Sequence, residues 1–293
     1  MSPQKKITIF LSLTVLFSAL SYIPIIGAGT ANVQGGIFVL TMMWSPGLAA
    51  ILTQLVATRS LRGLGWGLGS TRWLGVAYIL PILYALPIYA FTWISGLGTL
   101  LNPYDFSTLT KQFSSPNIVS AIAVYALIKA TKGVAEALLF SLGEEIGWRG
   151  LFVPELAKVT SFTRTALISG VVWAAWHIPV ILFADYHNGS TPVTFAAACF
   201  TVMIIGISFP FAWLTLKSRS LWTAVLLHTT HNVFIQGFFD RLTGSGSITP
   251  YITGEFGIGL AVTGLVVAYV FWQMRPDKSL SPSKVLTASA SQG

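Results

Sequence analysis

Two adjacent glutamates followed by an arginine stand out in a chain with few charges. They are Glu144, Glu145 and Arg149, within the segment SLGEEIGWRGLFVPEL. On a helix, Glu145 and Arg149 are four residues apart and share a face, so we expect an ion pair between them. Glu144 is turned about 100° away, so that pair leaves its carboxylate free for proton transfer. From this stretch alone, a salt bridge at the membrane interface is an equally good interpretation.

A histidine within an apolar run forms the second motif. His177 lies in VVWAAWHIPVILF, and Pro179 follows it two residues later. A proline inside a helix removes the hydrogen bond to the carbonyl of the residue four positions before it, here Ala175. The carbonyl of Ala175, beside His177, is therefore expected to lack its helical hydrogen bond. Taken alone, a buried histidine is usually only hydrogen-bonded.

The third motif places three polar side chains within two helical turns. In LLHTTHNVF, His228 and Asn232 are four residues apart, and His231 is three residues from His228. His228 and Asn232 share a helical face, and His231 can also point inward. The competing interpretation is hydrogen bonding between membrane helices.

The depths of these motifs allow them to meet. At 1.5 Å per residue, His177 lies roughly 18 Å and His228 roughly 10 Å from the cytosolic ends of their expected helices. Glu144 lies at the same end of its own helix. We therefore expect a cavity that opens to the cytosol. A carboxylate, two imidazoles and an amide in one cavity suit proton transfer and oxyanion stabilisation.

Other charged residues are expected to be solvated. Lys132 and Glu136 make an i,i+4 pair, which with Lys129 forms the wet face of an amphipathic helix. Asp185 and His187 are assigned to a solvated loop. Near the first motif, Gly143 and Gly147 form a Gly-x-x-x-Gly step, which lets a second helix approach closely.

The composition indicates the elements that must position these residues. Of 293 residues, 54% are hydrophobic and 9% are charged, and the mean hydropathy is +0.72. These values are typical of a polytopic membrane protein built from helices, an all-α bundle. We expect a single transmembrane domain, residues 1–274 with its catalytic core at about 120–240, and a polar, disordered tail, residues 275–293. Eight spans are predicted, at 7–29, 36–58, 73–100, 118–142, 165–184, 193–216, 221–239 and 255–274.

The net charge is +8, but the basic residues lie singly or in pairs between apolar runs and form no surface for nucleic acid. Basic residues placed in this way indicate which loops face the cytosol. With both termini in the cytosol, only Lys111 and Arg241 fall on the opposite side. The cytosolic side then receives thirteen: Lys5, Lys6, Arg59, Arg62, Arg72, Arg149, Lys158, Arg164, Lys217, Arg219, Arg275, Lys278 and Lys284.

Cys199 is the single cysteine, which excludes an intrachain disulfide. The first run is longer than the apolar core of a typical signal peptide and is interpreted as a retained helix.

Together the motifs resemble the signature of the CAAX prenyl protease and bacteriocin-processing (CPBP, or Abi) family of intramembrane proteases. That signature is Glu-Glu-x-x-x-Arg, an aromatic-x-x-x-His and His-x-x-x-Asn, each on a different helix. Here the residues are Glu144 to Arg149, Trp173 to His177 and His228 to Asn232. The family often has Phe at the position of Trp173. The resemblance covers residues 120–240.

The resemblance implies peptide-bond hydrolysis within the membrane, near its cytosolic face. Glu144 and His177 would activate water, and His228 and Asn232 would stabilise the oxyanion. Glu145 and Arg149 would support the site. The implied partners are membrane lipids and a peptide or protein substrate, in one branch of the family with a lipidated C-terminus.

No metal cofactor is favoured. Zinc bound by Glu144, His177 and His228 is the alternative. Against it, the three residues lie on separate helices, and Asn232 is a poor zinc ligand but a good amide donor. No nucleic acid is expected.

Two other classes of function remain open. One is a proton-coupled transporter, although the polar residues show no counterpart in the first half of the chain. The other is a non-catalytic membrane scaffold of the immunity type, which would tolerate loss of Glu144. In each case we expect a multi-pass protein of a prokaryotic cell membrane.

Overall fold

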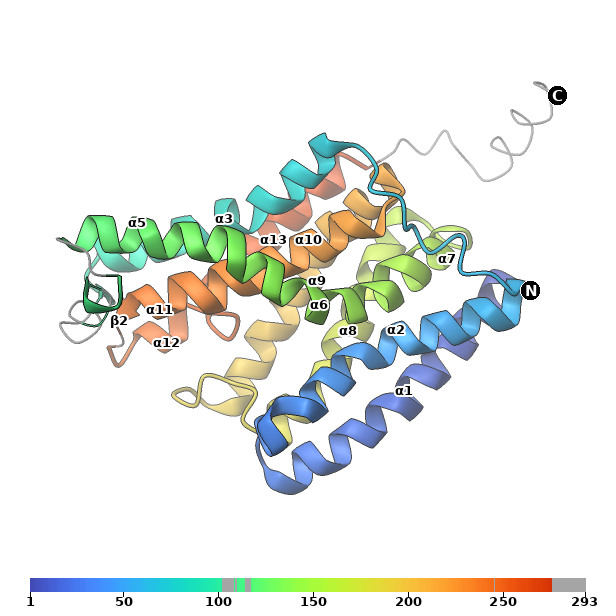
Figure 1. The fold of residues 1–293 in the computed structure, drawn as a ribbon, viewed down its shortest axis with the longest axis horizontal. Helices are drawn as coiled ribbons and strands as arrows, with labels where there is room; N and C mark the ends of the chain where they lie inside the picture. Colours follow the sequence, from blue (N-terminus) through green and yellow to red (C-terminus); the bar gives the residue numbers. More distant parts are fainter. Residues whose placement is uncertain (102–107, 109, 114–116, 245, 276–293) are drawn as a thin grey trace.

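The computed structural model describes residues 1–101, 108, 110–113, 117–244 and 246–275 (Figure 1). They form a helical bundle with one two-stranded antiparallel pair, β1 (Thr99–Leu100) with β2 (Thr243–Gly244). The tail predicted to be disordered lies, from residue 276, outside the described residues. The helices in chain order are α1 (Pro3–Ala28), α2 (Ile37–Thr58), α3 (Thr71–Ile94), α5 (Ile118–Ile128), α6 (Val134–Glu145), α7 (Val153–Ala157), α8 (Phe162–Phe183), α9 (Val193–Ser218), α10 (Leu221–Phe234), α11 (Asp240–Leu242), α12 (Thr249–Ile252) and α13 (Ile258–Gln273).

Short helices of other types join some of these elements. A 3₁₀ turn, η1 (Val33–Gly36), precedes α2. Three π-helical segments, η2 (Lys129–Gly133), η3 (Ile146–Phe152) and η4 (Ile235–Phe239), connect α5 to α6, α6 to α7 and α10 to α11.

The fold class predicted from composition, a polytopic membrane bundle, is confirmed. Six helical segments of the described chain are long and apolar enough to cross a membrane, and α13 is a shorter apolar helix. The predicted span at 221–239 is helical from Leu221 to Leu242 but is not among those six. The count of eight spans therefore stays a prediction.

The fourth predicted span differs most from the structure. Helix continues beyond residue 142 through η3, so the apolar segment runs from Ile118 to Ala157. The glycines in this continuation are sites of close packing. A Cβ atom at Gly147 would lie 2.5 Å from Cβ of Pro46 on α2, and one at Gly47 would lie 2.4 Å from the carbonyl oxygen of Gly143. The expected close approach at the Gly-x-x-x-Gly step is thus present, with α2 as the partner.

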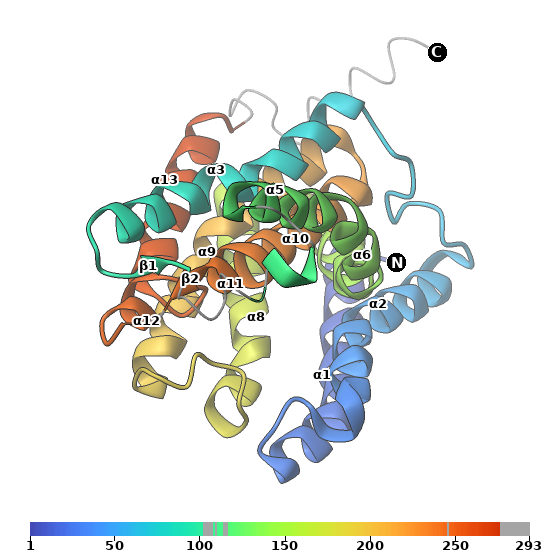
Figure 2. The same cartoon turned by 60° about the vertical axis from the view of Figure 1, so that its left-hand side comes forward.

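Helix α10 occupies the middle of the bundle (Figure 2). It contacts α3, α6 and α9, and most of its side chains are buried. Helices α1 and α2 pack against each other and against the segment from α6 to α7, whereas α8 packs on α9 and α9 on α13. The helices that carry the three motifs, α6, α8 and α10, therefore surround one region.

The two ends of the bundle are closed by different polar contacts. At one end, named here the Lys6 end, Lys6 Nζ lies 2.9 Å from Glu155 Oε1, and Trp222 Nε1 donates to the carbonyl oxygen of Trp66. At the other, named the Asp185 end, the Asp185 carboxylate accepts hydrogen bonds from the loop after α1. Successive long helices run alternately between these ends, as the predicted topology requires.

Candidate active site

Glu144 and Glu145 are the last two residues of α6, directly before the π-helical segment η3. A π-helical turn is wider than an α-helical one and is frequent at functional sites. Both carboxylates are buried, with exposed fractions of 2% and 0%. Two adjacent buried carboxylates need separate partners, and their partners do differ.

Glu145 forms the expected ion pair. Arg149 Nη1 donates to Glu145 Oε1 at 2.9 Å and Oε2 at 3.1 Å, within a pair that is fully buried. Oε1 of Glu145 also lies 2.8 Å from His228 Nδ1, on α10. Glu145 therefore connects the first motif to the third and is fully engaged.

Arg149 lies between two aromatic rings. Its guanidinium carbon is 4.1 Å from the ring centroid of Trp173 and 4.1 Å from that of Phe211. Its Nε and Nη2 atoms have no hydrogen-bond partner among the described residues. Cation–π contacts with Trp173 and Phe211, together with the ion pair to Glu145, thus stabilise the buried charge of Arg149. Because Arg149 is buried inside the bundle, it is not the cytosolic loop residue that the charge distribution suggested.

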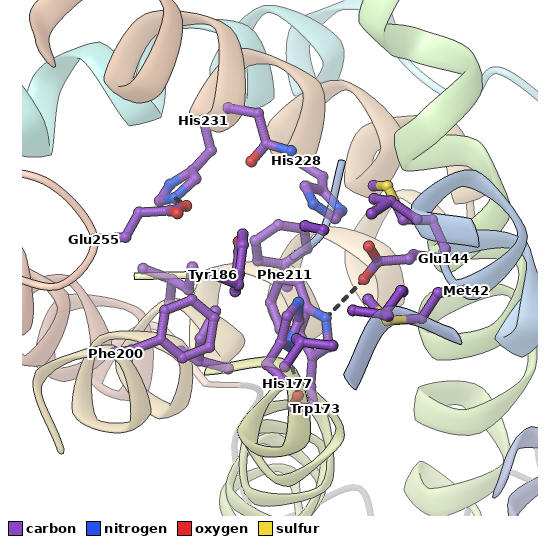
Figure 3. A pocket seen from close by; sticks show the side chains of 18 residues that line it. Met42, Glu144, Trp173, His177, Tyr186, Phe200, Phe211, His228, His231 and Glu255 are labelled. Atoms are coloured by element: carbon purple, nitrogen blue, oxygen red, sulfur yellow. Dashed lines mark hydrogen bonds and ion pairs between the residues drawn. The ribbon is translucent and has the colours of Figure 1, made fainter. Parts of the chain in front are cut away.

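Glu144 has a different partner, as expected. Its Oε2 accepts a hydrogen bond of 2.9 Å from Trp173 Nε1, and its carboxylate faces a cavity (Figure 3). The sequence marked Trp173 only as the aromatic residue of the second motif. Its N–H donor, which a phenylalanine lacks, fixes one oxygen of Glu144 and leaves the other toward the cavity.

His177 is held by the backbone of its own helix. Its Nδ1 lies 2.9 Å from the carbonyl oxygen of Trp173, one turn earlier. A carbonyl oxygen only accepts, so Nδ1 carries the proton, and Nε2 is the nitrogen available to the cavity. The ring of Tyr186 stacks on the imidazole at 5.9 Å, and Phe200 packs edge-on at 5.0 Å.

The cavity collects all four predicted reacting residues. Its volume is about 80 Å³, enough for several water molecules. Glu144, His177, His228 and Asn232 line it together with apolar side chains of α2 and α9. The predicted convergence of the three motifs is therefore present.

The direction of the cavity differs from the expected one. Its walls include Ile25, Ala31, Tyr186 and Glu255, which come from the Asp185 end of the bundle. The expected opening was toward the cytosol, which the charge distribution places at the Lys6 end. The depth estimate counted residues from that end only and did not include the loops of the Asp185 end, whose residues Ala31, Tyr186 and Glu255 line the cavity.

Sequence reasoning missed Glu255. It lies in the loop before α13, where the sequence showed only the edge of an apolar run. Its Oε1 is 2.8 Å from His231 Nε2, and its Oε2 accepts from Gln236 Nε2 at 2.8 Å. His231 also contacts the hydroxyl of Tyr84 through Nδ1. The sequence offered one signal: His231 had no assigned role, and Glu255 is a carboxylate at the start of the next predicted span.

The remaining polar candidates lie elsewhere. Lys132 and Glu136 form an exposed pair at 3.5 Å, as predicted for a wet face, and Lys129 Nζ packs over the ring of Tyr125. Asp185 is in a loop, as expected, but is more than a solvated residue. It accepts hydrogen bonds of 2.6 Å from the Ala31 backbone and the Thr30 hydroxyl.

Glu144, His177 and His228, the residues of the zinc alternative, all face the cavity. Among the described residues, no three His, Cys, Asp or Glu side chains are grouped closely enough to hold a metal ion.

Comparisons with known proteins agree with this site. Residues 126–234 match the family model of the type II CAAX prenyl endopeptidase Rce1-like proteins, a range that includes all three motifs. A curated CAAX prenyl protease 2 from Methanococcus maripaludis is 27% identical over 136 residues. That alignment covers 45% of this chain and 47% of the relative, so it spans about half of each. With the motifs in order and their residues gathered around one cavity, these matches support the resemblance of this chain to the CPBP family.

Proposed function

We propose that the protein is an intramembrane endopeptidase that hydrolyses a peptide bond with a water molecule activated by Glu144 and His177. The observation that carries the proposal is the free oxygen of Glu144 and the free Nε2 of His177 facing the same cavity. A carboxylate and a neutral imidazole can share the proton that water loses as it attacks the carbonyl carbon.

The proposed oxyanion site is on α10. As water attacks, the carbonyl oxygen becomes negative and needs preorganised donors. Nδ2 of Asn232 is one donor. His228 is the other if its Nε2 also carries a proton, and Glu145, bonded to its Nδ1, is the carboxylate that would offset the charge of that ring. When the intermediate collapses, the C–N bond breaks and the proton held by Glu144 or His177 passes to the leaving amine.

The reaction is proposed to need no metal, since the cavity residues fit a protein-only mechanism. The substrate is a peptide or protein segment held at the membrane. The curated relative is named a CAAX prenyl protease, so a prenylated C-terminus is one substrate to test here.

The test uses purified full-length protein with quenched fluorescent peptides, prenylated and unprenylated. Glu144→Gln keeps the size of the side chain but removes the base, so we expect turnover to fall by at least about 100-fold. Glu136→Gln is the matched control, because Glu136 is an exposed carboxylate in the same helix, and it should keep full activity. Activity retained by Glu144→Gln would exclude this mechanism.

Metal dependence needs a separate measurement. Chelator treatment should leave activity unchanged, with substoichiometric zinc in the active protein. Activity lost with zinc removal and restored by adding zinc back would contradict the metal-free proposal. A wild type that cleaves none of the peptides would favour the scaffold alternative.

A further inference from the structure

The cavity has a second acidic wall that the proposed reaction does not use. Glu255 lies in the loop between α12 and α13, outside the segment that matches the family model. It is 6% exposed and lines the cavity. Figure 3 shows Glu255 with His231 on one side of the cavity and Glu144 on the other.

The hydrogen bonds around Glu255 fix its protonation. The Tyr84 hydroxyl has Nδ1 of His231 as its partner, and it donates there when His231 is neutral. Nε2 of His231 must then carry the proton that it donates to Glu255 Oε1. Gln236 donates to Oε2. Every donor and acceptor is matched with Glu255 as an anion, beside either a neutral His231 or a protonated His231 whose Nδ1 donates to Tyr84.

Electrostatics agree with an ionised Glu255. Burial alone would raise the pKa of this carboxyl group, but the hydrogen bonds from His231 and Gln236 outweigh burial and hold the pKa below its ordinary value. The group thus keeps a negative charge.

In the described walls of the cavity, histidine is the only side chain that can offset that charge, and His231 is the one bonded to Glu255. These walls include no Lys or Arg side chain. The nearby Arg149 is already paired with Glu145. A buried carboxylate with a single imidazole as its partner is costly, and a cation arriving with a ligand would relieve that cost.

The position of Glu255 is fixed before any ligand binds. The preceding Gly254, with φ of +74°, donates its N–H to the Tyr89 hydroxyl at 3.1 Å. That hydroxyl donates to Asp240 Oδ1 at 2.5 Å. The loop is therefore tied to α3 and α11, and its carboxylate is preorganised.

A second hollow adjoins the cavity at Glu255. Its volume is about 400 Å³, and Tyr186 and Glu255 line both cavities. Asp185 and Asp240 add two carboxylates to its walls, and its described lining has no Lys or Arg. A peptide that extends from the reacting cavity toward the Asp185 end would run past Glu255 into an acidic, polar space.

We propose that Glu255 is a specificity residue that binds a cationic group of the substrate, on the part of the peptide directed toward the Asp185 end. A Lys or Arg side chain or a free amino terminus supplies the same chemistry. The inference rests on the proposed peptidase function of the same site. Glu255 takes no part in water activation.

The experiment compares quenched peptides that differ only in one charge. One series moves a single lysine through the positions around the scissile bond, each paired with acetyl-lysine. A second pairs free with acetylated amino termini, which distinguishes the two sources of the cation. We expect the wild type to prefer the cationic member about 10- to 100-fold in kcat/KM in one series.

The variant Glu255→Gln should lose that preference, measured as the ratio of kcat/KM between the cationic and the acetylated member of each pair. Glu136→Gln is again the control and should keep the preference. A wild type without any charge preference, or a Glu255→Gln variant that retains one, would overturn the inference. A wild type that cleaves no peptide would instead reject the proposed function.

A measurement on the wild type alone covers the case in which Glu255→Gln does not fold. An uncleavable analogue of the preferred cationic peptide should inhibit about 10- to 100-fold more strongly than its acetylated form. Equal inhibition by the two analogues would also overturn the inference.

Discussion

Trp173 joins three of the residues that the sequence motifs single out. Its N–H holds Glu144, its π face covers the Arg149 guanidinium, and its carbonyl oxygen contacts Nδ1 of His177. Each contact constrains a different property: which oxygen of Glu144 is free, where the buried cation sits, and which nitrogen of His177 faces the cavity. The orientation of the reacting groups thus depends on a residue that has no reacting group itself.

Replacement of Arg149 tests the buried pair at this scale. Arg149→Ala would leave the Glu145 carboxylate with only His228 as a partner, at a site with no access to water. Removing one partner of a buried ion pair typically costs about 3–5 kcal/mol. We expect a lower melting temperature in detergent and a lower yield of folded protein. Arg149→Ala with wild-type stability would show that the pair does not support the fold.

At the scale of elements, the Asp185 carboxylate joins the loop after α1 to the loop after α8. Hydrogen bonds from the Ala31 N–H and the Thr30 hydroxyl hold the pKa of Asp185 below its ordinary value. An acid whose pKa is lowered by folding stabilises the fold above its unfolded pKa, about 3.9, and loses that contribution as pH falls through the lower folded value. The contact therefore strengthens the fold at neutral pH and weakens below about pH 4.

Asp185→Asn should destabilise the protein by about 1 kcal/mol at pH 7, since the group is exposed and the bonds are charge-assisted. Thermal unfolding at pH 7 and pH 3 measures the effect. The difference between wild type and variant should shrink at pH 3. A difference that is equal at both pH values would contradict the assignment.

The elements also show what could be predicted from the sequence. The motif residues were identified because their spacing places them on helical faces, and the Glu145–Arg149 pair follows from that spacing alone. That prediction assumed helix at residues 144–149, but the extent of the helix to Ala157 could not be predicted, because glycine disfavours a helix by about 1 kcal/mol per residue. Only the approach of α2 to Gly143 and Gly147 explains why helix persists there. The partner of Glu255, His231, is 24 positions away, so no local pattern indicates their contact.

At the scale of the whole molecule, the charge distribution and the cavity lead to different expectations for the side of the membrane. Without the buried Arg149, the basic residues still number twelve of the original thirteen against two, which favours a cytosolic Lys6 end. The cavity and the acidic hollow beside it extend toward the Asp185 end. If the charge rule holds, this part of the cavity lies on the non-cytosolic side, whereas the depths of the motifs predict cleavage near the cytosolic face.

Cysteine labelling in intact cells tests this sidedness. The native Cys199 is buried, so Cys199→Ala gives an unreactive background for single cysteines in exposed loops. Arg62→Cys, at the Lys6 end, should react with an impermeant thiol reagent only after the cells are opened. Ser190→Cys, at the Asp185 end, should react in intact cells, because the loop that carries it would face outward. The reverse pattern would place the Asp185 end in the cytosol. It would contradict the charge-based topology and return the opening of the cavity to the cytosolic side.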